Sequence, residues 1–219
     1  MKKILFNDKF LLTKAVLEGR KTQTRRVIKV QPPYKNFDMA FPVFVEEDWH
    51  TNPLYGAFCW VNKDNPEEHT DWIRPAFKES EVVAVAQSYK DAGIEDVTDK
   101  DGFLYHTFTI YAYDNKMFVR ADMMPHQIRI TNVRVERLQN ITDECCLREG
   151  LEWDAKAQKY YAGYMKETEK KYWFGSTPRE AFAHLINKVS RKDVWSENPY
   201  VFVYDFELIN LNSATLLQI

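Results

Sequence analysis

The first thirty residues alternate between apolar and polar positions with two different periods. Leu12 and Val16 recur at the four-residue interval that gives a helix one apolar side. A short apolar strand is predicted before this helix, at residues 4–6. Gly19 follows this helix at the position where a C-terminal cap with left-handed backbone conformation is expected. Residues 22–30 are rich in Thr, Val and Ile, so they are predicted to leave the helix as a strand.

A short apolar run predicts a strand at residues 81–86, and further strands are predicted at residues 103–113, 117–120, 128–138 and 200–208. The run at 128–138 changes face around Asn132, which indicates a bulge. Asp114 and Asn115 are suited to a turn that joins 103–113 to 117–120 as a hairpin. The run at 200–208 is apolar on both faces over its first half, which is typical of a central strand or of one that closes a barrel.

Two capping sequences predict the later helices. Thr142 opens a helix over residues 142–149, and Gly150 can end it. Thr177 and Pro178 provide a cap and a first-turn proline for a second helix. Strands outnumber helices, and the helices fall at turns between strands. The sequence therefore predicts an α+β protein built on a small mixed or antiparallel β-barrel with short helices at its ends.

Two stretches interrupt these patterns. Residues 31–78 contain six prolines and the tryptophans Trp49, Trp60 and Trp72. We interpret this stretch as a large irregular insertion that packs against the core through its aromatic side chains. An aromatic set between prolines can also form a platform on which nucleic-acid bases stack. A second excursion, mostly polar and aromatic, covers residues 152–175.

Charge is distributed unevenly along the chain. Residues 1–35 hold ten Lys or Arg against two acids, a balance of +8, whereas the whole chain carries −2. A clustered cationic surface attracts phosphates whatever the net charge of the protein. Four of these cations, Arg20, Lys21, Arg25 and Arg26, lie where the first helix meets the strand at 22–30. This junction is therefore the first candidate for an anion site.

Several other classes of protein find no support in the sequence. The three cysteines form no CxxC pair and no even set, which favours a reduced cytoplasmic protein. Five scattered histidines show no metal-ligand spacing, so neither a metal nor a cofactor is expected. No apolar run approaches the ~20 residues of a membrane helix. Polar residues 7–9 interrupt the apolar N-terminus before a signal-peptide core can form, so no export is expected.

The motif Gly19-Arg20-Lys21-Thr22-x-Thr24-x-Arg26, after a short strand and helix, resembles the signature of the ASCH domain family, a branch of the PUA-like β-barrels. The likeness continues through three further blocks, at residues 133–142, 149–150 and 195–207. These blocks follow the order of the family and cover roughly half of the chain. Together they resemble the longer ASCH proteins common in bacteriophages and prophages.

The resemblance implies one PUA-like domain over residues 1–212, with a C-terminal tail at 213–219. Insertions on the barrel are then expected at residues 36–78, 91–116 and 152–175. In one place the chain departs from the family, because relatives of this type tend to have an Arg-Glu pair where this chain has Ala86-Gln87. That difference weakens the case for any activity that needs a charged pair there.

The first functional hypothesis is nucleic-acid binding. PUA-like barrels are known as RNA-binding modules, so the resemblance implies a cleft beside Lys21 that accepts RNA or a nucleotide-like ligand. The cations of the motif can neutralise phosphates, and each contact adds to the salt dependence of binding. Arginine can also hold a phosphate with two hydrogen bonds or stack on a base. The predicted ligand-binding residues are Gly19, Arg20, Thr22, Arg25 and Arg26.

The second hypothesis is hydrolysis. A small bacterial ASCH protein is an amidohydrolase that removes the acetyl group from 4-acetylcytidine, and its catalytic residues correspond to Lys21, Thr24 and Glu149 here. The resemblance implies Thr24 as nucleophile, Lys21 as proton acceptor and Glu149 as proton donor. A threonine hydroxyl attacks poorly without a base, and a lysine acts as a base only when its pKa is lowered. Some other ASCH proteins cleave RNA, so a ribonuclease also stays open.

A purely structural role is the third interpretation. A Lys-Thr-x-Thr-Arg-Arg strand can be an edge strand whose charges prevent aggregation. An acid before a glycine, as at Glu149, is usually a solvated helix end, so its candidacy rests on the resemblance. Arg134, Glu136 and Arg137 are predicted to form a solvated face of the strand at 128–138.

Overall fold

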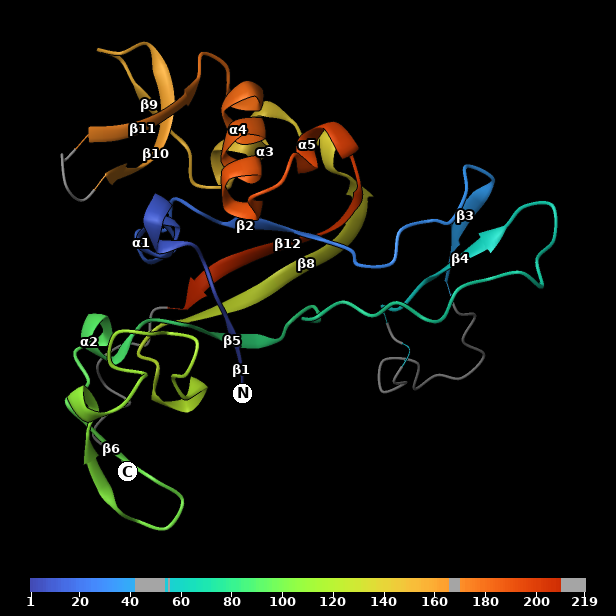
Figure 1. Cartoon of the computed structure of the whole chain (residues 1–219). Coiled ribbons are helices and arrows are strands. Elements are labelled where there is room, and N and C mark those ends of the chain that lie inside the picture. The colour runs from blue at the N-terminus through green and yellow to red at the C-terminus, as the bar shows by residue number, and fades with distance from the viewer. Residues whose placement is uncertain (42–53, 55, 166–169, 210–219) are drawn as a thin grey trace.

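The computed structural model describes residues 1–41, 54, 56–165 and 170–209, and a mixed five-stranded sheet lies at its centre (Figure 1). Its strands, in spatial order, are β1 (Lys2–Ile4), β5 (Val82–Val85), β8 (Gln127–Arg137), β12 (Tyr200–Ile209) and β2 (Gln23–Val27). β1 runs parallel to β5, and the other neighbours are antiparallel. The α+β class is confirmed. The described strands form no closed barrel, because β1 and β2 lie at opposite edges of the sheet.

The pairing of β8 with β12 forms the longest ladder of this sheet. Asn132 pairs with Asp205 and Ile130 pairs with Phe206, so Thr131 has no opposite residue. The bulge predicted around Asn132 is therefore confirmed. β12 lies between β8 and β2, and the predicted central strand is confirmed as well. Tyr204 lies in the buried part of β12, and its hydroxyl oxygen accepts a hydrogen bond from the amide of Ala76.

Among the described residues, α4 is the longest helix and the others are short. α3, α4 and α5 lie on one side of the core sheet next to β2 (Figure 1). The side-chain oxygens of Thr142 and Thr177 accept hydrogen bonds from the first turns of α3 and α4, as predicted. The helices are α1 (Leu12–Leu17), α2 (Tyr89–Ala92), α3 (Asp143–Arg148), α4 (Pro178–Ser190) and α5 (Val194–Glu197). Short 3₁₀ turns occur at η1 (Asp8–Phe10), η3 (Thr107–Thr109), η4 (Ala121–Met123) and η5 (Leu138–Asn140).

Near the N-terminus the observed elements lie close to the predicted strand and helix. β1 begins and ends two residues before the strand expected at residues 4–6. α1 carries the predicted apolar side, with Leu12 and Val16 both buried. Gly19 follows α1 at φ +72°, which is the left-handed conformation expected there. This turn directs the chain from α1 into β2.

The expected insertions contain regular structure, so their description as irregular is wrong. Residues 36–78 contain the antiparallel strand pair β3 (Phe37–Ala40) and β4 (Cys59–Asn62). Residues 152–175 form a sheet of β9 (Glu152–Asp154), β10 (Lys159–Met165) and β11 (Lys170–Gly175). Residues 91–116 contain a hairpin of β6 (Asp96–Thr98) and β7 (Leu104–His106).

The hairpin predicted between residues 103–113 and 117–120 is wrong. The carboxylate of Asp99 accepts hydrogen bonds from the amides of Asp101 and Phe103, each at 2.9 Å. Gly102 takes φ +86° in the same turn. Since this turn reverses the chain before Phe103, β7 pairs with the preceding strand β6 and not with residues 117–120.

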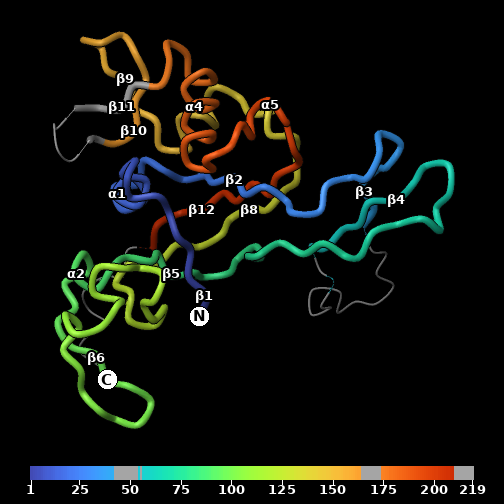
Figure 2. Tube along the Cα trace, in the orientation of Figure 1, coloured from blue at the N-terminus to red at the C-terminus, as the bar shows by residue number. Residues whose placement is uncertain are grey.

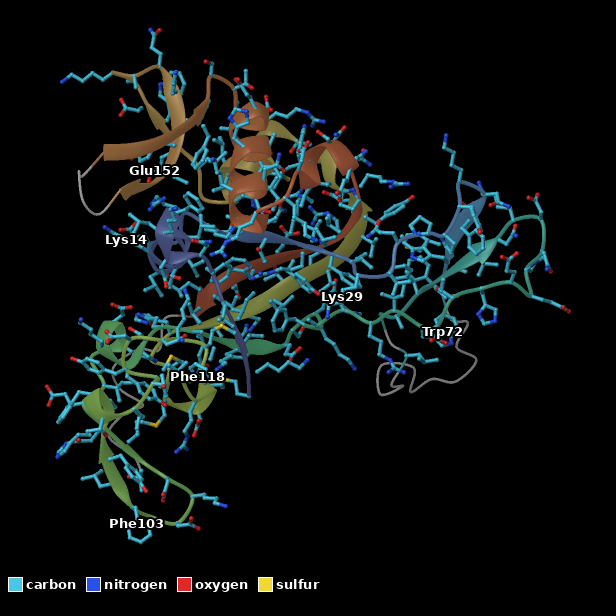
Figure 3. The ribbon with its side chains drawn as sticks, viewed as in Figure 1. Lys14, Lys29, Trp72, Phe103, Phe118 and Glu152 are labelled. Atoms are coloured by element: carbon cyan, nitrogen blue, oxygen red, sulfur yellow. The ribbon has the colours of Figure 1, made fainter. Side chains whose placement is uncertain are left out.

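Some of the aromatic residues of the 36–78 insertion pack against the core, as predicted. Trp60 is fully buried, and its ring lies 4.6 Å from that of Tyr200. Trp72 is 40% exposed, and Figure 3 shows it on the lobe that lies opposite the hairpin carrying Phe103. Trp49 belongs to residues 42–53, which lie outside the described part, as do residues 55 and 166–169 and the predicted tail at 213–219.

Candidate functional site at the junction of α1 and β2

Hydrogen bonds fix the backbone of the motif between two helices. The amides of Arg20 and Lys21 both donate to the carbonyl oxygen of Ala15 in α1, at 2.9 Å each. The next amide donates to the carbonyl oxygen of Arg148, the last residue of α3, at 3.0 Å. The trace in Figure 2 shows this segment lying alongside β12, near the other end of the chain. Because α3 ends at the motif, Glu149 lies beside Lys21.

Lys21 is a buried cation whose donors are all used. Its side chain is 2% exposed. The ammonium nitrogen Nζ donates to the carboxylate Oε2 of Glu149 at 2.6 Å and to the carbonyl oxygen of the same residue at 2.9 Å. The third bond goes to the carbonyl oxygen of Gln23 at 2.8 Å. Burial lowers the pKa of Lys21, and the attraction of Glu149 opposes that effect.

Glu149 also holds a second cation of the motif. Arg25 Nη1 donates to Glu149 Oε1 at 3.0 Å, so each carboxylate oxygen faces a different cation. The Nη2 group of Arg25 donates to Glu136 Oε1 at 2.8 Å. The guanidinium carbon lies 5.8 Å from the centre of the Phe182 ring, in cation–π range. Lys21 and Arg25 are therefore bound to carboxylates beneath α4 and are not exposed to solvent.

A third carboxylate, Asp205, extends this network along the sheet. Gln23 joins the two halves, because its amide oxygen accepts from Arg25 Nη1 at 2.5 Å and its Nε2 donates to Asp205 Oδ1 at 2.6 Å. Asp205 also accepts from Arg148 Nη2 at 2.7 Å and from Arg134 Nη1. Burial raises the pKa of Asp205, but the bond from Gln23 and the two arginines outweigh it, so the pKa is lowered overall.

The lowered pKa of Asp205 makes stability depend on pH in a defined direction. A carboxyl whose folded-state pKa is below its unfolded value of about 4 stabilises the fold above that pH, and the contribution is lost as pH falls through the folded pKa. We expect Asp205→Asn to lower the free energy of unfolding by about 2 kcal/mol at pH 7. The deficit shrinks below about pH 4. Urea unfolding of both proteins between pH 3 and pH 7 measures it, with Asp101→Asn as an exposed control.

The solvated strand face predicted for Arg134, Glu136 and Arg137 is correct only in part. Arg134 and Glu136 take part in the ion pairs just described, and they are only partly exposed. The guanidinium of Arg137 lies 4.0 Å from the centre of the Tyr200 ring. The reason is that β8 runs inside the sheet, so its polar residues meet charged and aromatic side chains of the neighbouring strands.

A small cavity of about 60 Å³ lies against this network. One side is polar and contains the motif, whereas α4 supplies an apolar wall, and the segment after β1 closes a third side. At about 10–15 Å³ per water this volume holds roughly five waters. The lining residues are Leu5, Phe6, Asn7, Leu12, Lys21, Thr24, Arg25, Arg26, Glu149, Phe182, Leu185, Ile186 and Val189.

Two of the lining residues have polar groups that a ligand in the cavity can reach. The hydroxyl of Thr24 has no hydrogen-bond partner among the described residues, although the residue is only 5% exposed. Every fully buried side-chain oxygen or nitrogen in the described part has a partner, so the Thr24 oxygen opens onto the cavity. Arg26 Nη2 donates to the carbonyl oxygen of Leu5 at 2.6 Å. In the described part of the chain Arg26 has no carboxylate partner, unlike the other cations of the motif.

The structure thus brings together part of the predicted site. Lys21, Thr24 and Glu149 all line the cavity, as do Arg25 and Arg26. The other predicted ligand-binding residues do not line it. Gly19 forms the turn after α1. Arg20 pairs with Glu18 at 2.5 Å and with Glu152 at 3.0 Å, and Thr22 accepts a bond from Arg148 Nε at 3.0 Å.

Sequence patterns did not identify the remaining parts of the site. The apolar wall comes from the stripe of α4 that includes Phe182 and Leu185, and the sequence predicted this segment only as a capped helix. Asp205 was also missed, although an acid within the apolar run of residues 200–206 is a usable signal. A lone charge in a buried strand requires a partner, because an unpaired buried charge is costly.

Two further observations limit the chemistry. Within residues 1–41, 54, 56–165 and 170–209, no group of three His, Cys, Asp or Glu is placed to hold a metal ion. Among the same residues no helix is long and apolar enough to cross a membrane.

Comparison with protein-family models gave no match, and comparisons with curated proteins and with solved structures gave none either.

Proposed function

We propose that this chain is an ASCH-type, PUA-like protein of the cytoplasm that binds RNA or a nucleotide-like ligand at the cavity beside Lys21. The observation that carries the proposal is a network of ion pairs next to an apolar wall, with Arg26 at the cavity as a cation that has no carboxylate partner among the described residues. Four cations (Lys21, Arg25, Arg134 and Arg148) and three carboxylates (Glu136, Glu149 and Asp205) form the network. Beside the cavity, Lys21 and Arg25 balance Glu149 and Glu136. The net +1 of the network lies on Arg134, Arg148 and Asp205, which do not line the cavity, so Arg26 supplies the positive charge there.

This arrangement suits a ligand that is both anionic and partly aromatic. A positive excess next to low-dielectric walls raises the local potential for anions. Buried ion pairs contribute little to stability compared with apolar side chains of the same volume, so a functional role accounts for the network better than a structural one. The α4 wall and Phe6 offer apolar surface to a base.

The volume of the cavity limits how the ligand binds. A drug-sized pocket encloses about 300–1,000 Å³, whereas this cavity has about 60 Å³. It therefore takes one edge or one substituent of a base, and the rest of the ligand lies across the mouth near Arg26. The phosphate contacts first assigned to Lys21 and Arg25 do not suit their buried, paired side chains, so Arg26 is the better candidate.

A hydrolase is the second candidate, and the open hydroxyl of Thr24 favours it. In an amide hydrolysis the Thr24 oxygen forms a bond to the carbonyl carbon, its proton passes to a base, and the C–N bond breaks as the amine leaves with that proton. A water molecule then cleaves the acyl-threonine ester, which releases the carboxylic acid and restores the hydroxyl of Thr24. Lys21 can be that base only as a neutral amine. In this structure three acceptors bind its ammonium hydrogens, and none of them is Thr24. Catalysis by Lys21 therefore requires one of these bonds to break first.

Two variants separate binding from hydrolysis. If the protein only binds its ligand, Lys21→Ala is expected to weaken binding of cytidine 5′-monophosphate at least tenfold, because the network loses a buried charge, while Thr24→Ala binds as the unaltered protein does. Titration calorimetry measures both. If the protein is a hydrolase, release of acetate from 4-acetylcytidine, or RNA cleavage, is lost in both variants.

Lys14→Ala is the matched control, because Lys14 is an exposed cation on α1 with a side chain 62% accessible. It tests whether removal of any nearby positive charge has the same effect. Both candidate functions would be contradicted if Lys21→Ala bound every probe, and turned it over, in the same way as Lys14→Ala. Thermal unfolding of each variant shows whether the fold is retained.

A further inference from the structure

Two arginines on the surface beside the cavity share one carboxylate. Arg148 Nη2 donates to Asp205 Oδ1 at 2.7 Å, and Arg134 Nη1 donates to Oδ2 of the same group. Their Nε groups are also held, by Thr22 Oγ1 at 3.0 Å and by Glu136 Oε2 at 3.4 Å. Neither arginine lines the cavity. Four hydrogen bonds therefore fix the orientation of both guanidinium groups.

Most of the hydrogen-bonding capacity of this pair is unused. A guanidinium has five N–H donors, and each of these two uses two of them. Within the described part of the chain, three donors of Arg134 and three of Arg148 have no partner. Their side chains are 33% and 37% exposed, whereas that of Asp205 is 10% exposed. The carboxylate lies inward, and the six free donors remain for water or a ligand.

The chemistry of the pair favours an oxyanion. Arg134, Arg148 and Asp205 together carry +1, and the charge of Glu136 is balanced by Arg25. Guanidinium groups bind phosphate through two parallel hydrogen bonds. Groups that are already held in place lose less entropy on binding than mobile surface side chains do.

We propose that Arg134 and Arg148 form a phosphate subsite for single-stranded RNA, so that one strand contacts these arginines and also reaches the cavity beside Lys21. The contact with the cavity rests on the proposed function, whereas the phosphate contact rests on the arginines. A hydrogen-bonded chain from Asp205 through Gln23 and Arg25 to Glu149 joins the two places. The ligand is then an oligonucleotide, and a free nucleoside occupies only part of the site.

The test measures binding of a fluorescein-labelled hexauridylate RNA by anisotropy at several salt concentrations. Arg134→Gln and Arg148→Gln are each expected to weaken binding about tenfold, and the slope of log K against log salt falls by about 0.7 for each phosphate that the variant no longer neutralises. Arg129→Gln is the matched control, because Arg129 is on the same strand and its side chain is 52% exposed. It is expected to change affinity less than twofold.

Each single variant leaves Asp205 one arginine, which protects the fold, and Arg148→Lys supplies a further variant that keeps the charge. Arg148→Lys is expected to bind RNA with an intermediate affinity, because it loses the two-bond geometry. The proposal is overturned if both glutamine variants bind RNA with the affinity and salt slope of the unaltered protein. It is also overturned if Arg129→Gln loses as much RNA affinity as they do.

A probe without phosphate separates this proposal from the function of the cavity. Cytidine is expected to bind Arg134→Gln and Arg148→Gln as it binds the unaltered protein, and to bind Lys21→Ala weakly. If cytidine binds none of these proteins but RNA binding still depends on Arg134 and Arg148, the phosphate subsite is supported and the nucleotide pocket is not. If both arginine variants lose cytidine and RNA equally, a separate phosphate subsite is ruled out.

Discussion

Glu149→Leu is expected to lower the free energy of unfolding by about 3–5 kcal/mol, which is typical of removing one partner of a buried ion pair. Lys21 loses its only carboxylate partner among the described residues while its side chain remains 2% exposed. Arg25 keeps Glu136, so Lys21 is the charge left uncompensated. Chemical denaturation at pH 7 measures the change.

The double variant Lys21→Met with Glu149→Leu is the control for this prediction. It removes both charges and fills the space with apolar side chains of similar size, so we expect it to recover most of the lost stability. A well-packed apolar pair is often as stable as the buried ion pair it replaces. A loss below about 1 kcal/mol in Glu149→Leu would show that water reaches Lys21 and that the pair is not buried.

Gly163→Ala is expected to cost about 4 kcal/mol, combining a left-handed backbone with a clash. Gly163 lies in β10 at φ +74°. An added Cβ would lie 2.6 Å from the Cα atom of Phe10 and 2.7 Å from its carbonyl carbon. These are backbone atoms, so neither can turn aside as a flexible side chain would. Thermal and urea unfolding measure the loss.

Gly93→Ala separates the two causes. Gly93 has a similar backbone, at φ +68°, and nothing lies within 4 Å of an added Cβ. Only the conformational cost applies there, about 1–2 kcal/mol. Equal losses of stability in the two variants would mean that β10 and η1 can move apart at little cost in free energy. A larger loss in Gly163→Ala shows that this packing holds the chain rigidly just before the cavity wall at Leu12.

Local sequence patterns predicted those elements whose signals lie within a few residues. Thr142 and Thr177 cap their helices because a cap needs only the next turn. The change of face around Asn132 showed the bulge, because a period of two is read within one strand. The turn at residues 99–102 was missed because Asp114 and Asn115 offer a competing turn on the other side of residues 103–113.

The candidate site was predictable only in part, because its members come from distant segments. The resemblance placed Lys21, Thr24 and Glu149 together, and all three line the cavity. No local period indicates that Gln23 faces Asp205, since this pairing depends on the register of two strands 182 positions apart in the sequence. The closed barrel expected from the family pattern depends on the same long-range pairing of edges, and the described sheet remains open between β1 and β2.

The order of the strands also determines when β2 can form its pairing during synthesis of the chain. β2 has one strand neighbour in the described sheet, β12, and Gln23 and Asp205 are paired in register although 182 positions separate them. At about 5–20 residues per second, ribosomes need roughly 10–40 s to add that length. Throughout that interval the cationic segment has no strand to pair with, so a nascent chain completes its charge network only after nearly all of its other elements have been synthesised.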